Sequence, residues 1–131
     1  MILPLIFFGV TLKELKSGLK IGIRKEIKGC NKFVSGNDLV YANVIARVEG
    51  RSEPIYDTYR TGKPLQFHAN ETSYIQGFLR GVRGACQGEI RRITIPPELA
   101  YKKESVEGLF GPSSTWIVDV EILEIVKTIT K

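Results

Sequence analysis

Side chains that commonly carry out chemistry are few in this chain and far apart. The sequence has one histidine, His68, and two cysteines, Cys30 and Cys86. A zinc site needs several such ligands at short spacings, and nucleophilic catalysis needs a base beside the nucleophile. Neither pattern is present, so we expect no metal and no cofactor, and we predict that His68 is a surface residue.

The glycines of the central stretch do not form a phosphate-binding loop. No strand is followed by Gly-x-Gly-x-x-Gly or by Gly-Lys-Ser/Thr. Gly84 and Gly88 are explained by a helix end and a turn. Gly77 and Gly81 fall inside a predicted helix, where each costs about 1 kcal/mol relative to alanine. We therefore expect Gly77 and Gly81 to permit close packing.

The residues from Ile75 to Tyr101 predict the elements that would position a site. Four apolar residues at helical spacing place one face of a short helix against a core: Ile75, Phe78, Leu79 and Val82. A strand from Gly88 to Ile95 follows, and Pro96-Pro97 ends it because neither residue has an N–H to donate. A turn then leads to Tyr101.

Three other stretches have the apolar alternation of strands. They are residues 19–24, the run from Asp38 to Val48, and the run from Thr115 to Ile125. Asp38 to Val48 is apolar on both faces, which favours a central position in a sheet. Residues 29–36 and 102–112 are predicted loops. The pattern predicts an α+β fold in which one antiparallel β-sheet wraps around one short α-helix.

The N-terminal segment is apolar from Met1 to Val10 apart from Gly9. It is too short to span a bilayer, which needs about 20 apolar residues, but it has the length of the hydrophobic region of a signal peptide. No basic residue precedes it and no clear cleavage site follows, so a signal remnant and a buried segment both remain open. Residues 11–17 fit a helical turn or an extended lead-in. We divide the chain into this segment with its lead-in, 1–17, and one domain, 18–131.

Composition argues against several classes of protein. The chain has 131 residues, of which 43% are hydrophobic and 25% charged, as in an ordinary globular domain. The net charge of +5 raises the question of a nucleic-acid partner. However, the basic residues are scattered, and acidic residues such as Glu89 and Asp119 lie among the arginines. We expect no nucleic acid, no stable membrane span, and a monomer.

Four short motifs in order carry a family resemblance. They are Ile75-Gln76-Gly77-Phe78, the run from Gly84 to Glu89, the run from Ile95 to Tyr101, and the run from Trp116 to Leu123. From about Leu19 to Ile125 the chain resembles the FKBP-type peptidyl-prolyl cis-trans isomerase domain. The resemblance implies the same fold and proline-containing polypeptides as substrates. An apolar cup suits this reaction, because rotating a peptide bond has a barrier of roughly 18–20 kcal/mol and needs no covalent step.

The resemblance also implies a set of site residues. Asp57 and Tyr101 would be catalytic, with the Tyr101 hydroxyl donating to the substrate carbonyl. The substrate-binding residues would be Asn43, Tyr56, Arg60, Leu65, Tyr74, Ile75, Phe78, Leu109, Phe110 and Val118. Phe78 and Val118 fit ordinary core positions equally well, whereas loop residues such as Asp57 and Tyr101 more often serve function.

Several of these positions differ from the family pattern. Asn43 stands where a pocket tyrosine is usual, Phe78 replaces a tryptophan, Leu65 and Val118 replace aromatic residues, and Lys102-Lys103 replaces a glycine-containing turn. Losing aromatic contacts removes on the order of 1 kcal/mol each. We therefore predict weakened isomerase activity and weak binding of macrolides of the FK506/rapamycin type. The alternative is a non-catalytic chaperone or protein-binding module on the same fold.

The cysteines bear on the cellular compartment. Their positions are similar to those of the family's secretory-pathway members, which implies a Cys30–Cys86 disulfide; two buried free thiols are the alternative. Asn70-Glu71-Thr72 is a glycosylation sequon, which matters only in that route. The C-terminus is not a retention tetrapeptide. We expect the secretory pathway, in the endoplasmic reticulum lumen or outside the cell, with the cytoplasm as the alternative.

Overall fold

The computed structural model describes residues 18–71, 74–101, 104 and 110–128, together with the backbone of residues 5–7 and 10–14. Its strands are β1 (Leu5–Phe7), β2 (Val10–Glu14), β3 (Lys20–Lys25), β4 (Leu39–Val48), β5 (Tyr56–Asp57), β6 (Leu65–His68), β7 (Ile90–Ile95) and β8 (Trp116–Val126). Its helices are α1 (Thr58–Thr61), α2 (Gln76–Val82) and the 3-10 turn η1 (Pro97–Leu99). None of the helices in these residues is long and apolar enough to cross a membrane.

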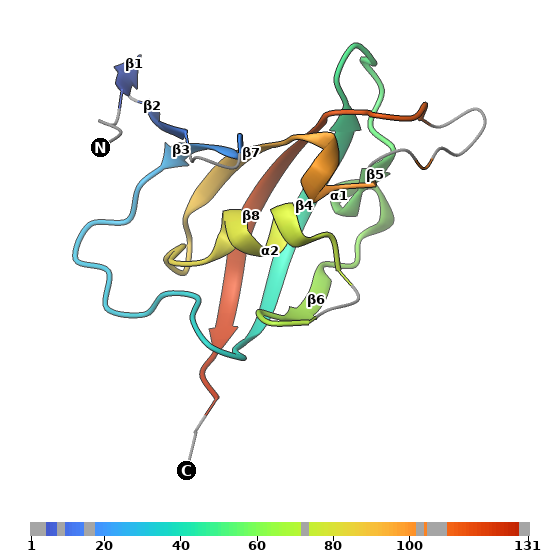
Figure 1. Ribbon diagram of the computed structural model, residues 1–131. Coiled ribbons are helices and arrows are strands. Elements are labelled where there is room, and N and C mark those ends of the chain that lie inside the picture. Colours follow the sequence, from blue (N-terminus) through green and yellow to red (C-terminus); the bar gives the residue numbers. More distant parts are fainter. Residues whose placement is uncertain are drawn as a thin grey trace.

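The strands form one antiparallel sheet in the order β1-β2-β3-β7-β8-β4-β5, with β6 also paired to β4. Helix α2 lies across one face of this sheet (Figure 1). This arrangement confirms the predicted α+β architecture and the central position of β4. The pairing of β2 with β3 carries the sheet into the first 17 residues, so residues 11–14 are extended rather than helical.

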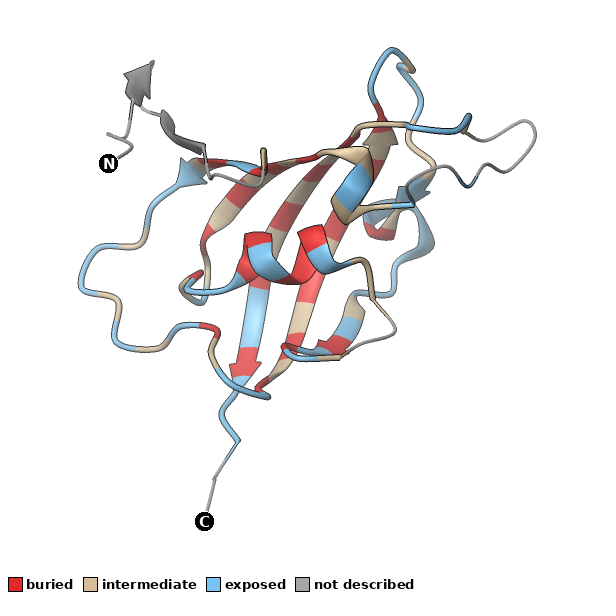
Figure 2. Ribbon diagram, in the orientation of Figure 1, coloured by how far each residue is buried: buried red, intermediate tan, exposed pale blue. Residues whose placement is uncertain are grey.

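Alternation along the central strands separates the core from the outer face. In β4, Val40, Ala42, Val44, Ala46 and Val48 are buried, while the residues between them are half-buried. Figure 2 shows the same alternation along β7 and β8 behind α2. Because β-branched residues pack well on a pleated surface, this face forms one continuous core with α2.

Two glycines allow α2 to approach β7 closely. A Cβ atom at Gly77 would lie 2.3 Å from Ile95 Cγ2, and one at Gly81 would lie 2.6 Å from Ile93 Cδ1. These distances confirm the expectation of close packing. After the helix, Gly84 has φ +78° and Gly88 has φ +92°, which are values that a glycine adopts without strain.

Helix α1 was not predicted, because its four residues are too few to show a hydrophobic period. The sequence nevertheless contains residues that are typical of a helix start and a helix end. The Asp57 side chain accepts a hydrogen bond from Tyr59 N at 2.9 Å, and Gly62 ends the helix with φ +72°. The Tyr59 hydroxyl donates to Glu121 Oε1 at 2.7 Å and fastens α1 to β8. Burial and Glu121 together raise the pKa of Tyr59 to about 12, so this hydroxyl keeps its proton.

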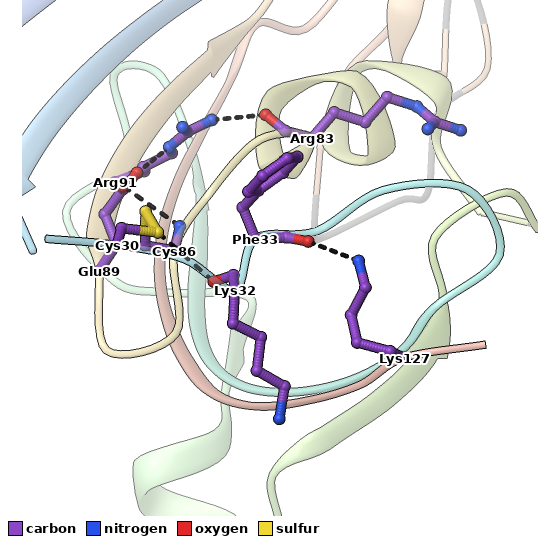
Figure 3. Close-up of a disulfide and its surroundings, with 8 residues drawn as sticks. All are labelled: Cys30, Lys32, Phe33, Arg83, Cys86, Glu89, Arg91 and Lys127. Carbon is purple, nitrogen blue, oxygen red and sulfur yellow. Dashed lines mark hydrogen bonds and ion pairs between the residues drawn. A yellow bond between two sulfur atoms is a disulfide. The ribbon is translucent and has the colours of Figure 1, made fainter. Parts of the chain in front are cut away.

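A disulfide joins the loop before β4 to the turn after α2. Cys30 and Cys86 are bonded, with Cα atoms 6.0 Å apart, which confirms the pairing implied by the resemblance (Figure 3). Beside it, Lys127 Nζ donates to Phe33 O at 2.9 Å and to Asp38 Oδ2 at 2.6 Å. Burial raises the pKa of the Asp38 carboxyl, but hydrogen bonds from Lys127, Ser35 and Thr128 outweigh it and hold the pKa below its usual value. The C-terminal end of β8 is therefore tied to the same loop as the disulfide.

Candidate functional site

An apolar cavity of about 540 Å³ opens between α2 and the sheet. This volume is typical of a small-molecule or short-peptide site. Its lining contains no charged side chain and consists of Val44, Ala46, Ile55, Tyr56, Leu65, Tyr74, Ile75, Phe78, Ile95, Tyr101, Trp116 and Val118.

Small aliphatic side chains line the cavity where β4 and β8 pair. Ala46 lies directly opposite Val118 in the register of these strands, and Val44 is two residues further along β4. Since residues two apart on a strand share a face, all three reach the cavity from the buried side of the sheet. We call these three residues the aliphatic floor. Short side chains there fill less of the cavity than aromatic rings would.

One wall is an aromatic cluster of Phe67, Tyr74 and Phe78. The ring centroids of Phe67 and Phe78 are 5.1 Å apart, and those of Phe67 and Tyr74 are 5.6 Å apart. The Tyr74 hydroxyl donates to Gln66 O at 3.2 Å, so its proton is already engaged. Burial, with a smaller effect from Glu71 and Tyr56, raises the pKa of Tyr74. Tyr74 therefore stays neutral and gives the wall an apolar surface.

A second aromatic cluster consists of Tyr101, Phe110 and Trp116, of which Tyr101 and Trp116 line the cavity, and we call it the Trp116 wall. The Tyr101 ring stacks on Phe110 with centroids 5.0 Å apart and lies 5.4 Å from Trp116. Tyr101 is 37% exposed. Its hydroxyl has no hydrogen-bond partner among the described residues, so this O–H is a donor available to a ligand at the rim of the cavity.

Seven of the residues assigned by the resemblance come together around this cavity. They are Tyr56, Leu65, Tyr74, Ile75, Phe78, Tyr101 and Val118. Phe110 lies behind Tyr101 in the Trp116 wall. Leu109 and the Lys102-Lys103 pair lie outside the described residues.

Asn43 and Arg60 do not line the cavity. Asn43 Oδ1 accepts a hydrogen bond from Thr58 Oγ1 at 2.9 Å on the outer side of β4. The neighbouring Val44 takes the inward position, because alternate residues of a strand face opposite sides. The Arg60 side chain is largely exposed, and its Nε atom lies 3.9 Å from Asp57 Oδ2.

Asp57 also lies outside the lining. It caps α1, and its side chain is only 16% exposed. It directly follows Tyr56, which does line the cavity. Asp57 therefore fixes the junction of β5 and α1 that carries Tyr56.

Five lining residues were not assigned from the sequence: Val44, Ala46, Ile55, Ile95 and Trp116. Val44 and Ala46 lie in the run from Asp38 to Val48, which is apolar on both faces, so the sequence did not show which face points inward. Alternation also does not tell which buried residues, Trp116 among them, border a cavity. His68, as predicted, lies on the surface, where its ring Nδ1 is 3.3 Å from Asn37 O.

Comparison with known proteins identifies relatives of similar size and shape. Residues 30–123 match the family model described as FKBP-type peptidyl-prolyl cis-trans isomerase. The chain is 31% identical over 121 residues to peptidyl-prolyl cis-trans isomerase FPR2 of Saccharomyces cerevisiae, covering 91% of this chain and 90% of that protein. It is 33% identical over 116 residues to FK506-binding protein 2 of Yarrowia lipolytica, covering 86% of this chain and 79% of that one.

Two solved structures have the same fold. FkpA from Escherichia coli superposes with a TM-score of 0.76 at 30% identity, covering 88% of this chain and 51% of that chain. AtFKBP13 superposes with a TM-score of 0.75 at 25% identity, covering 86% of this chain and 97% of that chain.

Proposed function

The chain belongs to the FKBP-type peptidyl-prolyl cis-trans isomerase family, and we propose that the cavity beneath α2 is its active site. The observation that carries the proposal is an uncharged, largely apolar cavity lined by Tyr101, whose hydroxyl has no partner in the part of the chain that the structure describes. The substrates we propose are Xaa-Pro bonds of polypeptides.

The chemistry follows from the amide bond. Resonance that places negative charge on oxygen and positive charge on nitrogen gives the bond its double-bond character and its barrier of roughly 18–20 kcal/mol. Water stabilises that charge-separated form, so an apolar cavity that removes the prolyl amide from water favours the twisted amide. The Tyr101 hydroxyl donates to a substrate carbonyl and fixes the peptide in the cavity.

Replacing Tyr101 by phenylalanine tests this assignment. The change keeps the ring that packs on Phe110 and Trp116 and removes only the donor. One hydrogen bond lost from the transition state should lower kcat/KM about three- to tenfold. NMR exchange spectroscopy on a short Xaa-Pro peptide measures the rate, and thermal unfolding checks that stability is kept. Unchanged exchange in a folded variant would contradict the role of Tyr101.

Asp57 is a positioning residue in this proposal. Two substitutions distinguish the effect of its N-cap hydrogen bond from the effect of its negative charge. Asparagine is as good an N-cap as aspartate, whereas alanine costs about 1 kcal/mol. We expect Asp57→Asn to retain both stability and exchange rate, and Asp57→Ala to lose part of each. Chemical denaturation and peptide exchange measure the two effects. An Asp57→Asn variant that is stable but as slow as Asp57→Ala would show that the carboxylate acts directly.

The activity we propose is lower than that of a relative with a more aromatic cavity. The aliphatic floor of Val44, Ala46 and Val118 gives a ligand less contact area than aromatic rings would. Macrolides of the FK506/rapamycin type should bind weakly for the same reason. Titration calorimetry beside FK506-binding protein 2 of Yarrowia lipolytica tests this, and equal affinity would contradict it.

A second candidate is a chaperone or protein-binding module that holds proline segments without speeding their rotation. The aliphatic floor favours it, because its apolar side chains can contact a proline segment but supply no donor to a twisted amide. Peptide resonances that shift without faster exchange would establish this function instead.

We further propose that the protein resides in the secretory pathway, in the endoplasmic reticulum lumen or outside the cell, and acts as a monomer. The Cys30–Cys86 disulfide supports this compartment, since disulfides persist in oxidising environments. Protein recovered from that route should contain no free thiol on titration; two free thiols would contradict the assignment.

A further inference from the structure

Trp116 is the sole tryptophan of the chain and lies at the first position of β8. There it pairs with Val48 of β4 and Ile95 of β7, so its backbone is held between two strands. Its side chain is 5% exposed and borders the cavity. Tyr101 and Phe110 pack against its ring, the latter in an edge-to-face contact at 5.2 Å between centroids.

The indole N–H of Trp116 is an unpaired donor. Its Nε1 atom is buried and has no hydrogen-bond partner among the described residues. A buried donor without a partner is unfavourable, because it has given up its hydrogen bond to water and gained none in return. The other buried unpaired atom among these residues, Arg47 Nε, belongs to a guanidinium that still pairs with Asp119.

The position of this donor is informative. In the aromatic cluster of Phe67, Tyr74 and Phe78, the Tyr74 hydroxyl already donates to Gln66 O, and the floor of the cavity is aliphatic. Among the described residues, two unpaired side-chain donors therefore belong to neighbouring rings of the Trp116 wall, the Tyr101 hydroxyl and the Trp116 N–H, with ring centroids 5.4 Å apart. A bound peptide backbone supplies carbonyl acceptors that can satisfy both.

We propose, on the premise that this cavity is the isomerase site, that Trp116 is a second substrate-contacting residue whose indole N–H donates a hydrogen bond to a carbonyl oxygen of the bound prolyl peptide. The N–H is closed to solvent in the free protein, so the rings of Tyr101 and Phe110 shift to admit one oxygen. Because the donor is already buried in the free protein, forming this bond requires little further desolvation of the protein.

NMR of uniformly ¹⁵N-labelled wild-type protein tests the contact, since a single tryptophan gives a single indole N–H resonance. A short Xaa-Pro peptide should move this resonance downfield until binding saturates, and the same peptide with alanine in place of proline should leave it unmoved. Backbone resonances around α2 that shift while the indole signal stays still would overturn the proposal for Trp116 alone. No shift anywhere would instead overturn the proposed site and this inference with it.

Two variants separate donation from packing. Trp116→Phe keeps an aromatic ring and removes the N–H donor. Phe110→Leu disturbs the same wall but keeps the Trp116 N–H. We expect Trp116→Phe to lower kcat/KM about three- to tenfold, and more than Phe110→Leu does at matched thermal stability. Equal losses in the two folded variants would show that Trp116 only packs, and would overturn the hydrogen bond.

Discussion

Replacing Arg91 by methionine should lower the free energy of unfolding by about 3–5 kcal/mol, because it leaves the buried Glu89 carboxylate without its partner. Arg91 is 8% exposed and Glu89 is 4% exposed, and Arg91 Nε donates to Glu89 Oε2. Arg91 Nη1 also donates to Arg83 O at 3.0 Å (Figure 3). It donates as well to Gly81 O at 2.9 Å, so both carbonyls at the end of α2 are paired. One guanidinium therefore neutralises a buried charge and caps a helix.

Chemical denaturation measures this loss, and the adjacent arginine provides a matched control. Arg92 forms an ion pair with Asp119 on the more exposed side of β7, with Nε 2.8 Å from Oδ1. Arg92→Met should cost no more than about 1 kcal/mol, as exposed pairs do. The double variant Glu89→Leu with Arg91→Met should recover part of the loss, because it removes both charges. Equal costs for Arg91→Met and Arg92→Met would contradict the special role of the buried pair.

Arg91 also illustrates what the sequence could predict. Ile93 and Ile95 identified the buried face of β7, and the same alternation places Arg91 on that face. From the sequence, however, we considered the arginines only as scattered basic residues. Composition alone suggests that a charged residue is exposed, and a buried arginine becomes plausible only when Glu89 and the end of α2 are known to surround it.

The elements that position the site were predictable because their patterns are local. The helix stripe, the Pro96-Pro97 strand end and the turn to Tyr101 lie within one continuous stretch. Which residue of β4 faces the cavity can be told only when the pairing register of the strand is known. A shift of one residue exchanges Asn43 for Val44 and moves every side chain to the other face. The Trp116 wall required packing between a turn and a distant strand, which no local pattern encodes. The resemblance implied a catalytic role for Asp57, and its hydrogen bond to the first turn of α1 was visible only in three dimensions.

Removing the disulfide with the pair Cys30→Ala and Cys86→Ala should lower the free energy of unfolding by roughly 4 kcal/mol. The bond links residues separated by 56 positions, and the unfolded chain gains the entropy of that open loop. Denaturation of the double variant, beside wild type with and without reductant, measures the effect. Reduced wild type should resemble the variant; a stable reduced protein would show that hydrogen bonds such as that from Val34 N to Ala85 O, 2.9 Å long, already hold the loop.

The same variant should leave the isomerase rate per folded molecule nearly unchanged, since α2 separates the two functions along its length. Ile75 and Phe78, at the start of the helix, line the cavity. The disulfide and Arg91 instead hold its other end, where Cys86 N donates to Glu89 Oε1 at 3.3 Å. Exchange measured well below the unfolding temperature should therefore match wild type. A slower folded variant would mean that strain at the end of α2 reaches Phe78, and that the disulfide positions the cavity as well as stabilising the fold.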